Sequence, residues 1–484
     1  MGLMAFAVAC GDDDGTGTSG MGDMAVDMPA ADAGFIRVWH LADGAGDVDV
    51  FVNGAATLEG FGFEANTDYI ELPAGSYDVA VAPAGMGIGA AVITVDGFAL
   101  AAGERWTLIA AQTDADPAAA GALSILPVLE SATAPGSDEV EFQIFHAAYA
   151  VPGAVDVHNA SDPLLGEIAA GVAQGSVAPM TVTVPNGAYA IGLDVDDDDT
   201  VDLVTENPID QPPGGTRVLV GAISKAEGDE VETEIVFLVG DGANIHDETE
   251  LGAAEFGTVR FWHLADEAGD VDIFVGGTAI ATGVGFEVNT AFAPFLAGDL
   301  DIAIAPAGMG AGAAVISANL PLGEGENYTV IAAQLDADET MASSFAALPI
   351  LEDLSPLLAS QVNVRVFHAA YGVPDPVEVH AIDGDTNPEV VDNLMQGTAA
   401  AMAVAVPRED ALTVGLDLDD DGTPDVQTED ALGPFPDGIR FVTVGAITKL
   451  VMEGGELEEE TEIVFLPGDG AMIHDETELV PFEG

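Results

Sequence analysis

The sequence contains a single cysteine, Cys10, so no disulfide can form within the chain. Its folded parts must therefore be stabilised by side-chain packing. Beyond the extreme N-terminus, no uninterrupted apolar run reaches the ~20 residues that a membrane-spanning helix needs. These absences argue against a disulfide-bonded scaffold and against a bundle of membrane helices.

Positive charge is also scarce. The chain has 9 Lys and Arg against 84 Asp and Glu, a formal net charge of −75. Nucleic acid is excluded as a partner, because its binding requires clustered Lys and Arg that displace counterions. An anionic membrane surface would repel the chain. Cations, cationic proteins and neutral polar ligands remain open as partners, as does a role of the charge in solubility or in a saline setting.

Apolar residues, in contrast, are plentiful. They make up 49% of the 484 residues, enough for packed cores despite the charge. A chain of this length is expected to form three to five domains of ordinary size.

The N-terminus resembles a bacterial lipoprotein signal peptide. An apolar segment ends in Ala-Val-Ala before Cys10, and Gly11 with three aspartates follows. In such signals the Cys carries a diacylglycerol, and the resemblance therefore implies lipidation of Cys10. The pattern departs from the usual one because no Lys or Arg precedes a short apolar run, and a buried N-terminal segment is the alternative. We expect a truncated lipoprotein signal at 1–10 and a flexible acidic tether at 11–33, rich in Gly, Asp, Ser and Thr.

An internal duplication organises the rest of the chain. FIRVWHLADGAGDVDVFVNG recurs as TVRFWHLADEAGDVDIFVGG, FQIFHAAYAVPGAVDVHNA recurs as VRVFHAAYGVPDPVEVHAI, and both halves close on an IHDETEL segment. The first and second units of each half also resemble each other, which gives the order A-B-A′-B′. The expected domains are A at 34–130, B at 139–250, A′ at 256–352 and B′ at 361–480, with joints around 130–138, 251–257 and 353–360.

The segments within each unit are short, alternate between apolar and polar residues, and are rich in Val, Ile, Phe and Thr. Turn signals separate them every 8–12 residues, and Asn53-Gly54 and Gly276-Gly277 suit two-residue hairpins with positive φ. No long apolar stripe of helical period is present. The pattern predicts an all-β protein of four tandem sandwiches with few helices.

One family resemblance is specific. RVWHLADGAGDVDVFVNG, YIELPAGSYDVAVAPAG and AAGERWTLIAAQ, all in A, resemble domain-of-unknown-function family 4397. The likeness covers A and A′ nearly end to end and is looser in B and B′. It implies an exported protein with an immunoglobulin-like or transthyretin-like fold, and it brings no activity or catalytic residues.

An aspartate-rich loop in B′ is the best chemical candidate. Its carboxylates at positions 1, 3, 5 and 9, with Gly at position 6, resemble the first part of a calcium loop. Position 12, where a bidentate Glu belongs, is Thr428, with Glu429 one residue late, and the B copy has Asp at position 6. A solvated acidic hairpin tip is the alternative. The candidate calcium ligands are Asp417, Asp419, Asp421 and Asp425 in B′, and Asp194, Asp196, Asp198 and Asp202 in B.

The eight histidines form four pairs across the duplication: His40 and His263, His146 and His368, His158 and His380, and His246 and His474. Asp156, His158 and His146 could form a metal cluster only on one face of a sheet. Alternation predicts that His146 points inward and that His158, at the position of Phe51 in A, points outward, which excludes the cluster. We expect the strand-end histidines to bond to backbone instead, and His246 and His474 to lie in closing turns.

Arg37, Arg260 and Arg365 each precede a strand-end His by three residues. With so few cations in the chain, we expect each of them to pair with a carboxylate of a neighbouring strand.

No G-x-S-x-G elbow or H-E-x-x-H pair is present, and no Walker loop or dinucleotide-binding fingerprint follows an expected strand. The sequence therefore predicts a non-enzymatic, exported, lipid-anchored surface protein on an outer membrane or cell surface. It would touch the membrane through its lipid alone and bind an unidentified extracellular or periplasmic ligand, assisted by calcium. A purely structural envelope component is the alternative, and a hydrolase of unknown type is a remote one.

Overall fold

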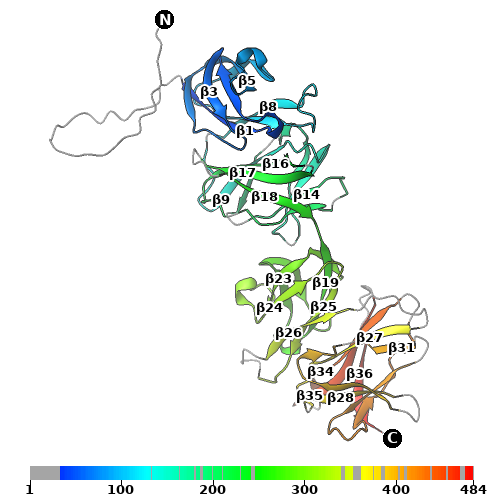
Figure 1. Ribbon diagram of the computed structural model, residues 1–484. Coiled ribbons are helices and arrows are strands. Elements are labelled where there is room, and N and C mark those ends of the chain that lie inside the picture. Colours follow the sequence, from blue (N-terminus) through cyan, green and yellow to red (C-terminus); the bar gives the residue numbers. More distant parts are fainter. Residues whose placement is uncertain are drawn as a thin grey trace, which may run out of the picture. The chain divides into compact units, whose positions relative to one another are not determined.

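The protein is described by a computed structural model (Figure 1). Residues 1–32, which include Cys10 and nearly all of the expected tether, lie outside the part that the model describes. The structure describes residues 33–484 except 132, 163, 179–180, 186–188, 199, 210, 229, 241–245, 339–343, 353–360, 374, 383–386, 402–403, 408–410, 436–438, 454–455, 469–474 and 483–484.

The described residues form strands throughout, and the helical elements among them are short 3-10 turns. The prediction of an all-β, duplicated architecture is confirmed, because each half repeats the sheets of the other. The chain divides into two compact units. Among the described residues, one comprises those within 33–40, 46–110 and 127–133, and the other comprises those within 41–45, 111–126 and 134–482.

A consists of two four-stranded sheets with strand orders β4-β1-β7-β8 and β3-β2-β5-β6. Alternation along β1 sends Ile36 to one side and Arg37 and Trp39 to the other, and all three are buried. The elements of A are β1 (Ala33–Leu41), η1 (Asp43–Ala45), β2 (Val48–Val52), β3 (Ala55–Phe61), β4 (Ile70–Pro73), β5 (Gly75–Pro83), η2 (Ile88–Ala90), β6 (Ile93–Leu100), β7 (Arg105–Gln112) and β8 (Leu123–Glu130).

A′ repeats this arrangement, with strand orders β22-β19-β25-β26 and β21-β20-β23-β24. Its core draws on both sheets and includes Phe261, Ile273, Ile304 and Val330. The elements of A′ are β19 (Phe256–Leu264), η3 (Asp266–Ala268), β20 (Val271–Val275), β21 (Thr278–Val284), β22 (Ala293–Leu296), β23 (Gly298–Pro306), η4 (Ala311–Ala313), β24 (Ile316–Leu322), β25 (Asn327–Gln334) and β26 (Phe345–Leu351).

B and B′ are each one ten-stranded sheet that folds over a single core. The path in B is β11-β10-β14-β15-β18-β17-β16-β9-β12, with β13 also paired to β9. Its strands are β9 (Glu139–His146), β10 (Ala154–Asn159), β11 (Glu167–Ala173), β12 (Ser176–Val177), β13 (Val182–Pro185), β14 (Ile191–Asp194), β15 (Leu203–Thr205), β16 (Arg217–Glu227), β17 (Glu230–Val239) and β18 (His246–Ala253).

B′ follows the same path, β29-β28-β32-β33-β36-β35-β34-β27-β30, with β31 paired to β27. Its strands are β27 (Gln361–His368), β28 (Val377–Ile382), β29 (Glu389–Leu394), β30 (Thr398–Ala399), β31 (Val404–Pro407), β32 (Thr413–Asp417), β33 (Val426–Thr428), β34 (Phe441–Glu453), β35 (Glu456–Pro467) and β36 (Asp475–Pro481).

The two layers of B and B′ are joined by one strand that changes layers, which the sequence did not reveal. Residues 246–250 of β18 pair with β17, and residues 251–253 pair with β15. β36 does the same between β35 and β33. Because β18 runs to Ala253 and β19 begins at Phe256, only two residues separate these strands within the stretch 251–257.

The predicted hairpin turns are confirmed where φ is positive. Asn53 and Gly54 have φ of 49° and 78°, and Gly276 and Gly277 have φ of 55° and 83°. Glycine adopts such values without steric cost, and Asn does so more readily than most residues.

A second apolar cluster joins the sheets of A′ and B′ within the second unit. It contains Trp262 and Ile331 from A′ and Phe367, Ile447 and Val464 from B′, all fully buried. The alternate residues of the same strands face the separate cores of A′ and B′.

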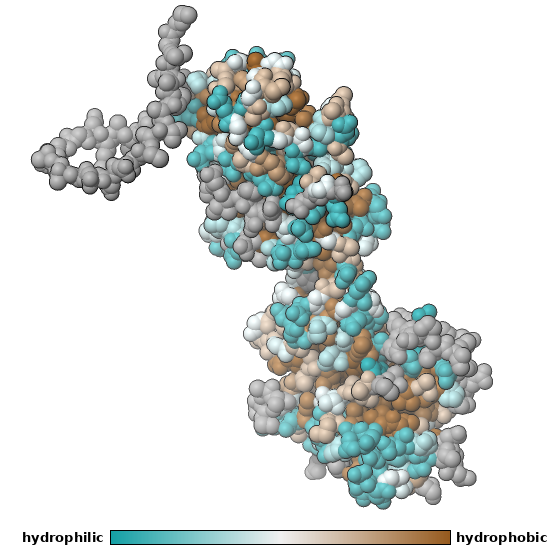
Figure 2. All heavy atoms as spheres, in the orientation of Figure 1, coloured by the Kyte–Doolittle hydropathy of each residue, from teal (hydrophilic) through white to brown (hydrophobic). Residues whose placement is uncertain are grey.

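Hydrophilic residues, together with smaller groups of hydrophobic ones, lie on the visible face of the described parts of the chain (Figure 2).

Candidate metal centre

The aspartate-rich segment of B′ is a hairpin loop between β32 and β33. Asp417, the last residue of β32, is fully buried and anchors the loop. Its Oδ1 accepts N–H groups of Asp419 (3.1 Å) and Asp420 (2.9 Å), and its Oδ2 accepts the N–H of Gly422 (2.7 Å). Asp420 and Gly422 have φ of 58° and 80°, so the backbone curls around the Asp417 carboxylate.

Three of the four predicted calcium ligands converge in this loop. Carboxylate oxygens of Asp417, Asp419 and Asp425 lie within 4.8 Å of one another. Asp421 is not part of this group, but its negative charge is the largest cause of a raised pKa at Asp419, followed by burial and by Asp425 and Asp417. The loop therefore concentrates negative charge that a cation would neutralise.

The B copy has the same geometry. Asp194, Asp196 and Asp202 offer carboxylate oxygens within 4.8 Å of one another. The charge of Asp198 is the largest cause of a raised pKa at Asp196. Asp197 has a φ of 60°, which matches Asp420 of B′.

The resemblance to a calcium loop ends after the ninth position. Thr428 lies in β33, is buried, and accepts the N–H of Val414 through its Oγ1 (3.2 Å), so the twelfth position serves the sheet. Asp425 Oδ2 accepts the N–H of Leu418 (2.8 Å) and closes the hairpin. An ion here would be held by the loop carboxylates, backbone carbonyls and water.

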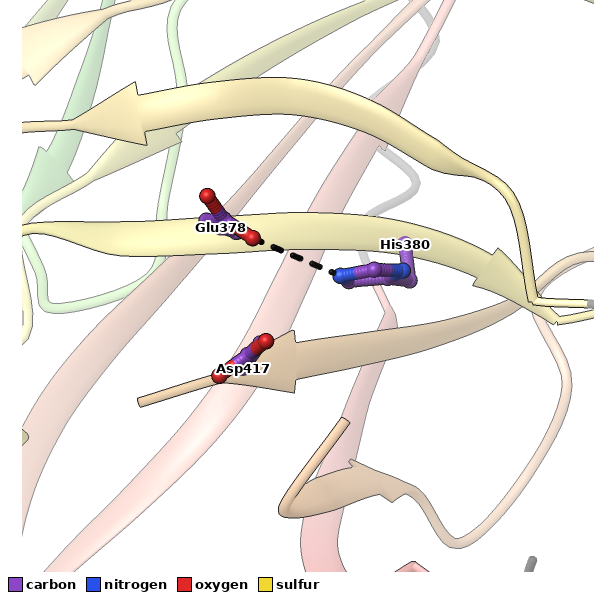
Figure 3. A group of neighbouring side chains, drawn as sticks. All are labelled: Glu378, His380 and Asp417. Atoms are coloured by element: carbon purple, nitrogen blue, oxygen red, sulfur yellow. Dashed lines mark ion pairs between the residues drawn. The ribbon is translucent and has the colours of Figure 1, made fainter. Parts of the chain in front are cut away.

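A neighbouring group that the sequence analysis did not assemble consists of Glu378, His380 and Asp417 (Figure 3). Glu378 and His380 lie two residues apart on β28, and Asp417 is paired with Glu378 across the β28–β32 ladder. All three are buried, and each offers a ligand atom within 4.8 Å of the others. His380 Nε2 lies 3.9 Å from Glu378 Oε2, along the dashed line in Figure 3.

Glu378 is surrounded by other acids. Burial raises the pKa of Glu378 to about 7, aided by a hydrogen bond with Asp420 and by the charges of Glu389, Asp420 and Asp417. Glu389 and Asp392 of β29 also offer oxygens within 4.8 Å of Glu378. The outer surface of β28 thus carries a dense patch of carboxylates.

The histidine predictions are confirmed at several positions. Nε2 of His40 and of His263 bonds to the carbonyls of Gly46 (2.8 Å) and Gly269 (2.7 Å). His146 and His368 are buried on the core faces of B and B′, as predicted, but their ring nitrogens have no hydrogen-bond partner among the described residues, so the expected bond to backbone is not found there.

His158 shares a face with Asp156 and alternates with core residues Val155 and Val157, so it faces away from the core that His146 joins. It is nevertheless buried, and its Nδ1 bonds to the carbonyl of Leu165 (2.8 Å). The side chain of His246 and the whole of His474 lie outside the described residues.

The structure confirms that Arg37 and Arg260 pair with carboxylates, but the prediction that these lie on the neighbouring strand is wrong. Arg37 lies 3.1 Å from Glu130, and Arg260 lies 3.4 Å from Glu352. Each carboxylate is two strands away, and a Thr on the intervening strand bonds to both groups. The prediction is wrong for Arg365, which donates to the carbonyls of Leu351 and Ala400 (2.9 and 3.1 Å).

The sequence matches the family Domain of unknown function (DUF4397) over residues 34–158 and 257–379, about half of the chain. The protein belongs to the DUF4397 family. Each DUF4397 match covers almost all of an A-type sandwich and continues through β9 and most of β10, or β27 and the first half of β28, of the next one. The aspartate loops of B and B′ lie beyond both matches.

Comparisons with curated proteins and with solved structures give no further relative of this DUF4397 protein that carries an argument. No curated protein matches it. A solved structure, the Bacillus anthracis TIE protein, aligns at 9% identity over 74% of this chain and 68% of that chain, with a TM-score of 0.13. Among the described residues, no helix has the length and apolar character needed to cross a bilayer.

Proposed function

We propose that this DUF4397 protein is a non-enzymatic, exported surface protein, anchored through a lipid on Cys10, whose sandwiches bind an extracellular or periplasmic ligand with the assistance of calcium. The observation that supports calcium binding is the convergence of three loop carboxylates in each half, Asp417, Asp419 and Asp425 being the B′ set. Calcium takes six to eight oxygen ligands, and affinities of about 10⁻⁴–10⁻³ M are typical of extracellular modules.

Duplication supports the binding role. Two copies of a weak site on one chain raise the total affinity for a ligand that reaches both of them. The tether expected at 11–33 would hold these sandwiches away from a lipid anchor, and the acidic composition opposes contact with anionic lipid.

The test is thermal unfolding of the full chain in 10 mM calcium chloride, compared with a chelator at equal ionic strength. A site of the expected affinity should add about 1.4–2.7 kcal/mol to the stability of the domain that binds the ion. The double variant Asp419→Asn and Asp421→Asn should remove the part of this gain that comes from B′, and magnesium at the same concentration should give less.

Equal melting in calcium and in chelator would refute the calcium part of the proposal and favour the purely structural envelope role. The proposed lipid anchor on Cys10 is tested separately. Metabolic labelling with a fatty acid should mark the wild-type chain but not Cys10→Ser, provided that the expressed gene includes the complete signal.

A further inference from the structure

His380 carries a buried nitrogen that the protein fold does not use. Its Nδ1 lies 2.8 Å from the carbonyl oxygen of Asn387, and a carbonyl can only accept, so Nδ1 holds the ring proton. Nε2 is then left with a lone pair. It is buried, in a side chain that is 2% exposed, and has no hydrogen-bond partner among the described residues. Such a group is uncommon, because burying an unpaired acceptor is costly.

The surroundings of Nε2 are carboxylates. Glu378 Oε2 lies 3.9 Å away, too far for a hydrogen bond. Asp417 offers an oxygen within 4.8 Å of both. In a neutral ring this lone pair would face two acids, which is unfavourable unless a proton on Nε2 or a metal ion lies between them. A ring bonded to a backbone carbonyl through one nitrogen, with the other nitrogen facing acids, is the arrangement that metal-ligating histidines use.

The positions of A that correspond to Glu378, His380 and Asp417 do not provide a set of metal ligands. The register of β2 with β5 matches that of β28 with β32. Phe51 and Ala82 join a small apolar cluster there and offer no ligand atom. The residues of A that occupy the places of Glu378, His380 and Asp417 are Asp49, Phe51 and Ala82.

B is intermediate. His158 makes the corresponding Nδ1 contact, to Leu165, but Asp156 stands where B′ has Glu378. The shorter side chain of Asp156 keeps its Oδ1 on the N–H of Gly171 (2.5 Å). Among the described residues, the structure does not bring Asp156, His158 and Asp194 together as a ligand set. The longer side chain of Glu378 is what completes the group in B′.

We propose that Glu378, His380 and Asp417 bind one divalent transition-metal ion of the zinc class. An imidazole nitrogen with two carboxylates suits such ions, whereas calcium prefers an all-oxygen shell. Tetrahedral metal–ligand bonds of about 2.0–2.2 Å place two donors of one ion about 3.3–3.5 Å apart, so Nε2 and Oε2, now 3.9 Å apart, need to approach each other by about 0.5 Å to share an ion. Water would complete the shell, entering past the side chain of Glu378, which is 11% exposed.

This site is separate from calcium binding, although Asp417 belongs to both groups. His380 and Glu378 lie on β28 and take no part in the loop group, whereas Asp419 and Asp425 take no part in the histidine group. The inference therefore goes beyond the proposed function and does not depend on it.

The experiment is zinc titration of the full chain by calorimetry in 0.15 M sodium chloride, which screens the many exposed acids, and without calcium, which would compete for Asp417. The expected result is saturable binding of one zinc ion. His380→Gln and Glu378→Gln should each weaken it at least tenfold, and the matched control His158→Gln should leave it unchanged. Wild-type affinity in His380→Gln, or loss of binding in His158→Gln, would overturn the assignment.

X-ray absorption spectroscopy of the zinc-loaded wild-type chain tests the same site without any variant. It therefore decides the question even if the variants fail to fold. One imidazole nitrogen with oxygens at about 2.0–2.2 Å is expected, and a shell of oxygen alone would refute the site. Asp421→Asn distinguishes the two ions, because it should weaken the calcium response and preserve zinc binding. Failure of zinc binding with an intact calcium response would refute this inference alone.

Discussion

Arg260 and Glu352 form a completely buried ion pair, with Nη2 3.4 Å from Oε1. The same Oε1 accepts hydrogen bonds from Thr329 of A′ and from Thr443 of β34 in B′, the latter at 2.7 Å. Arg260 Nη1 also donates to the carbonyl of Gly468 in B′ (3.1 Å). Burial raises the pKa of Glu352, and the charge of Arg260 is the main influence against this rise. The pair therefore connects two sandwiches through polar bonds beside their shared apolar cluster.

Glu352→Gln should destabilise this half of the chain strongly. Removing one partner of a buried pair leaves an uncompensated charge and costs about 3–5 kcal/mol. Calorimetry should show a lowered unfolding transition for the variant. Thr443→Val is the milder companion, because it removes one hydrogen bond worth about 1 kcal/mol. If Glu352→Gln melts as the wild type does, the pair does not contribute to stability.

The sequence predicted this pair only in outline. The shortage of cations, and the place of Arg37 and Arg260 three residues before a strand-end His, indicated that both would be paired with acids. Neither observation indicated that these acids lie two strands away. Residue separation gives no information on which strands a sheet places side by side. For Arg365 the same reasoning failed, because the carbonyls of Leu351 and Ala400 satisfy its donors.

Alternation predicted the faces correctly and still missed the histidine group. It placed His158 opposite His146, which the sheet confirms, but it gave no information on the strands beside His158 and His380. The third member lies across the β28–β32 ladder, where Asp417 pairs with Glu378. The Glu-x-His spacing was visible in the sequence, but the register that brings Asp417 to it required the structure.

The layer-changing strands β18 and β36 were also hidden. A strand that pairs on both sides of one core has the same alternating pattern as a strand that stays in one sheet. The duplication and the hairpins, in contrast, depend on local sequence and were therefore predictable.

His368 should make B′ sensitive to mild acid. Burial lowers the pKa of its ring from 6.5 to about 4, with a small opposing effect of Asp375. The unfolded chain therefore binds a proton that the folded chain does not, and stability is lost as the pH falls below 6.5. The loss should reach about 3 kcal/mol at pH 4.

Melting temperatures of the wild type and His368→Leu, measured from pH 7 to pH 4, check this expectation. The variant should lose less stability over that range, because leucine takes up no proton. Parallel curves for the two proteins would show that the ring does not titrate as its burial implies.

The position of the Phe367 ring requires that residue 445 has no side chain, because the ring lies directly over Gly445. A Cβ added to Gly445 would lie 2.3 Å from ring atoms of Phe367, which packs edge-on against Trp262 with ring centroids 6.1 Å apart. Gly445→Ala should cost about 1–3 kcal/mol through overpacking, and adding Phe367→Leu should recover part of that loss. Gly312→Ala is the control, because no atom lies within 4 Å of its added Cβ.

Gly422 tests whether the shape of the B′ loop, and not only its charge, matters for calcium. Its φ of 80° is left-handed, and no atom lies within 4 Å of an added Cβ, so a substitution would meet backbone strain alone. Gly422→Ala should destabilise the loop by roughly 1–2 kcal/mol and shift the calcium titration to higher concentration, whereas Gly422→Asn should do so less, because Asn tolerates this conformation. Both variants leave every carboxylate in place. An unchanged titration in Gly422→Ala would mean that calcium responds to the acidic charge of the loop and not to the curl that Asp417 holds with its three backbone hydrogen bonds.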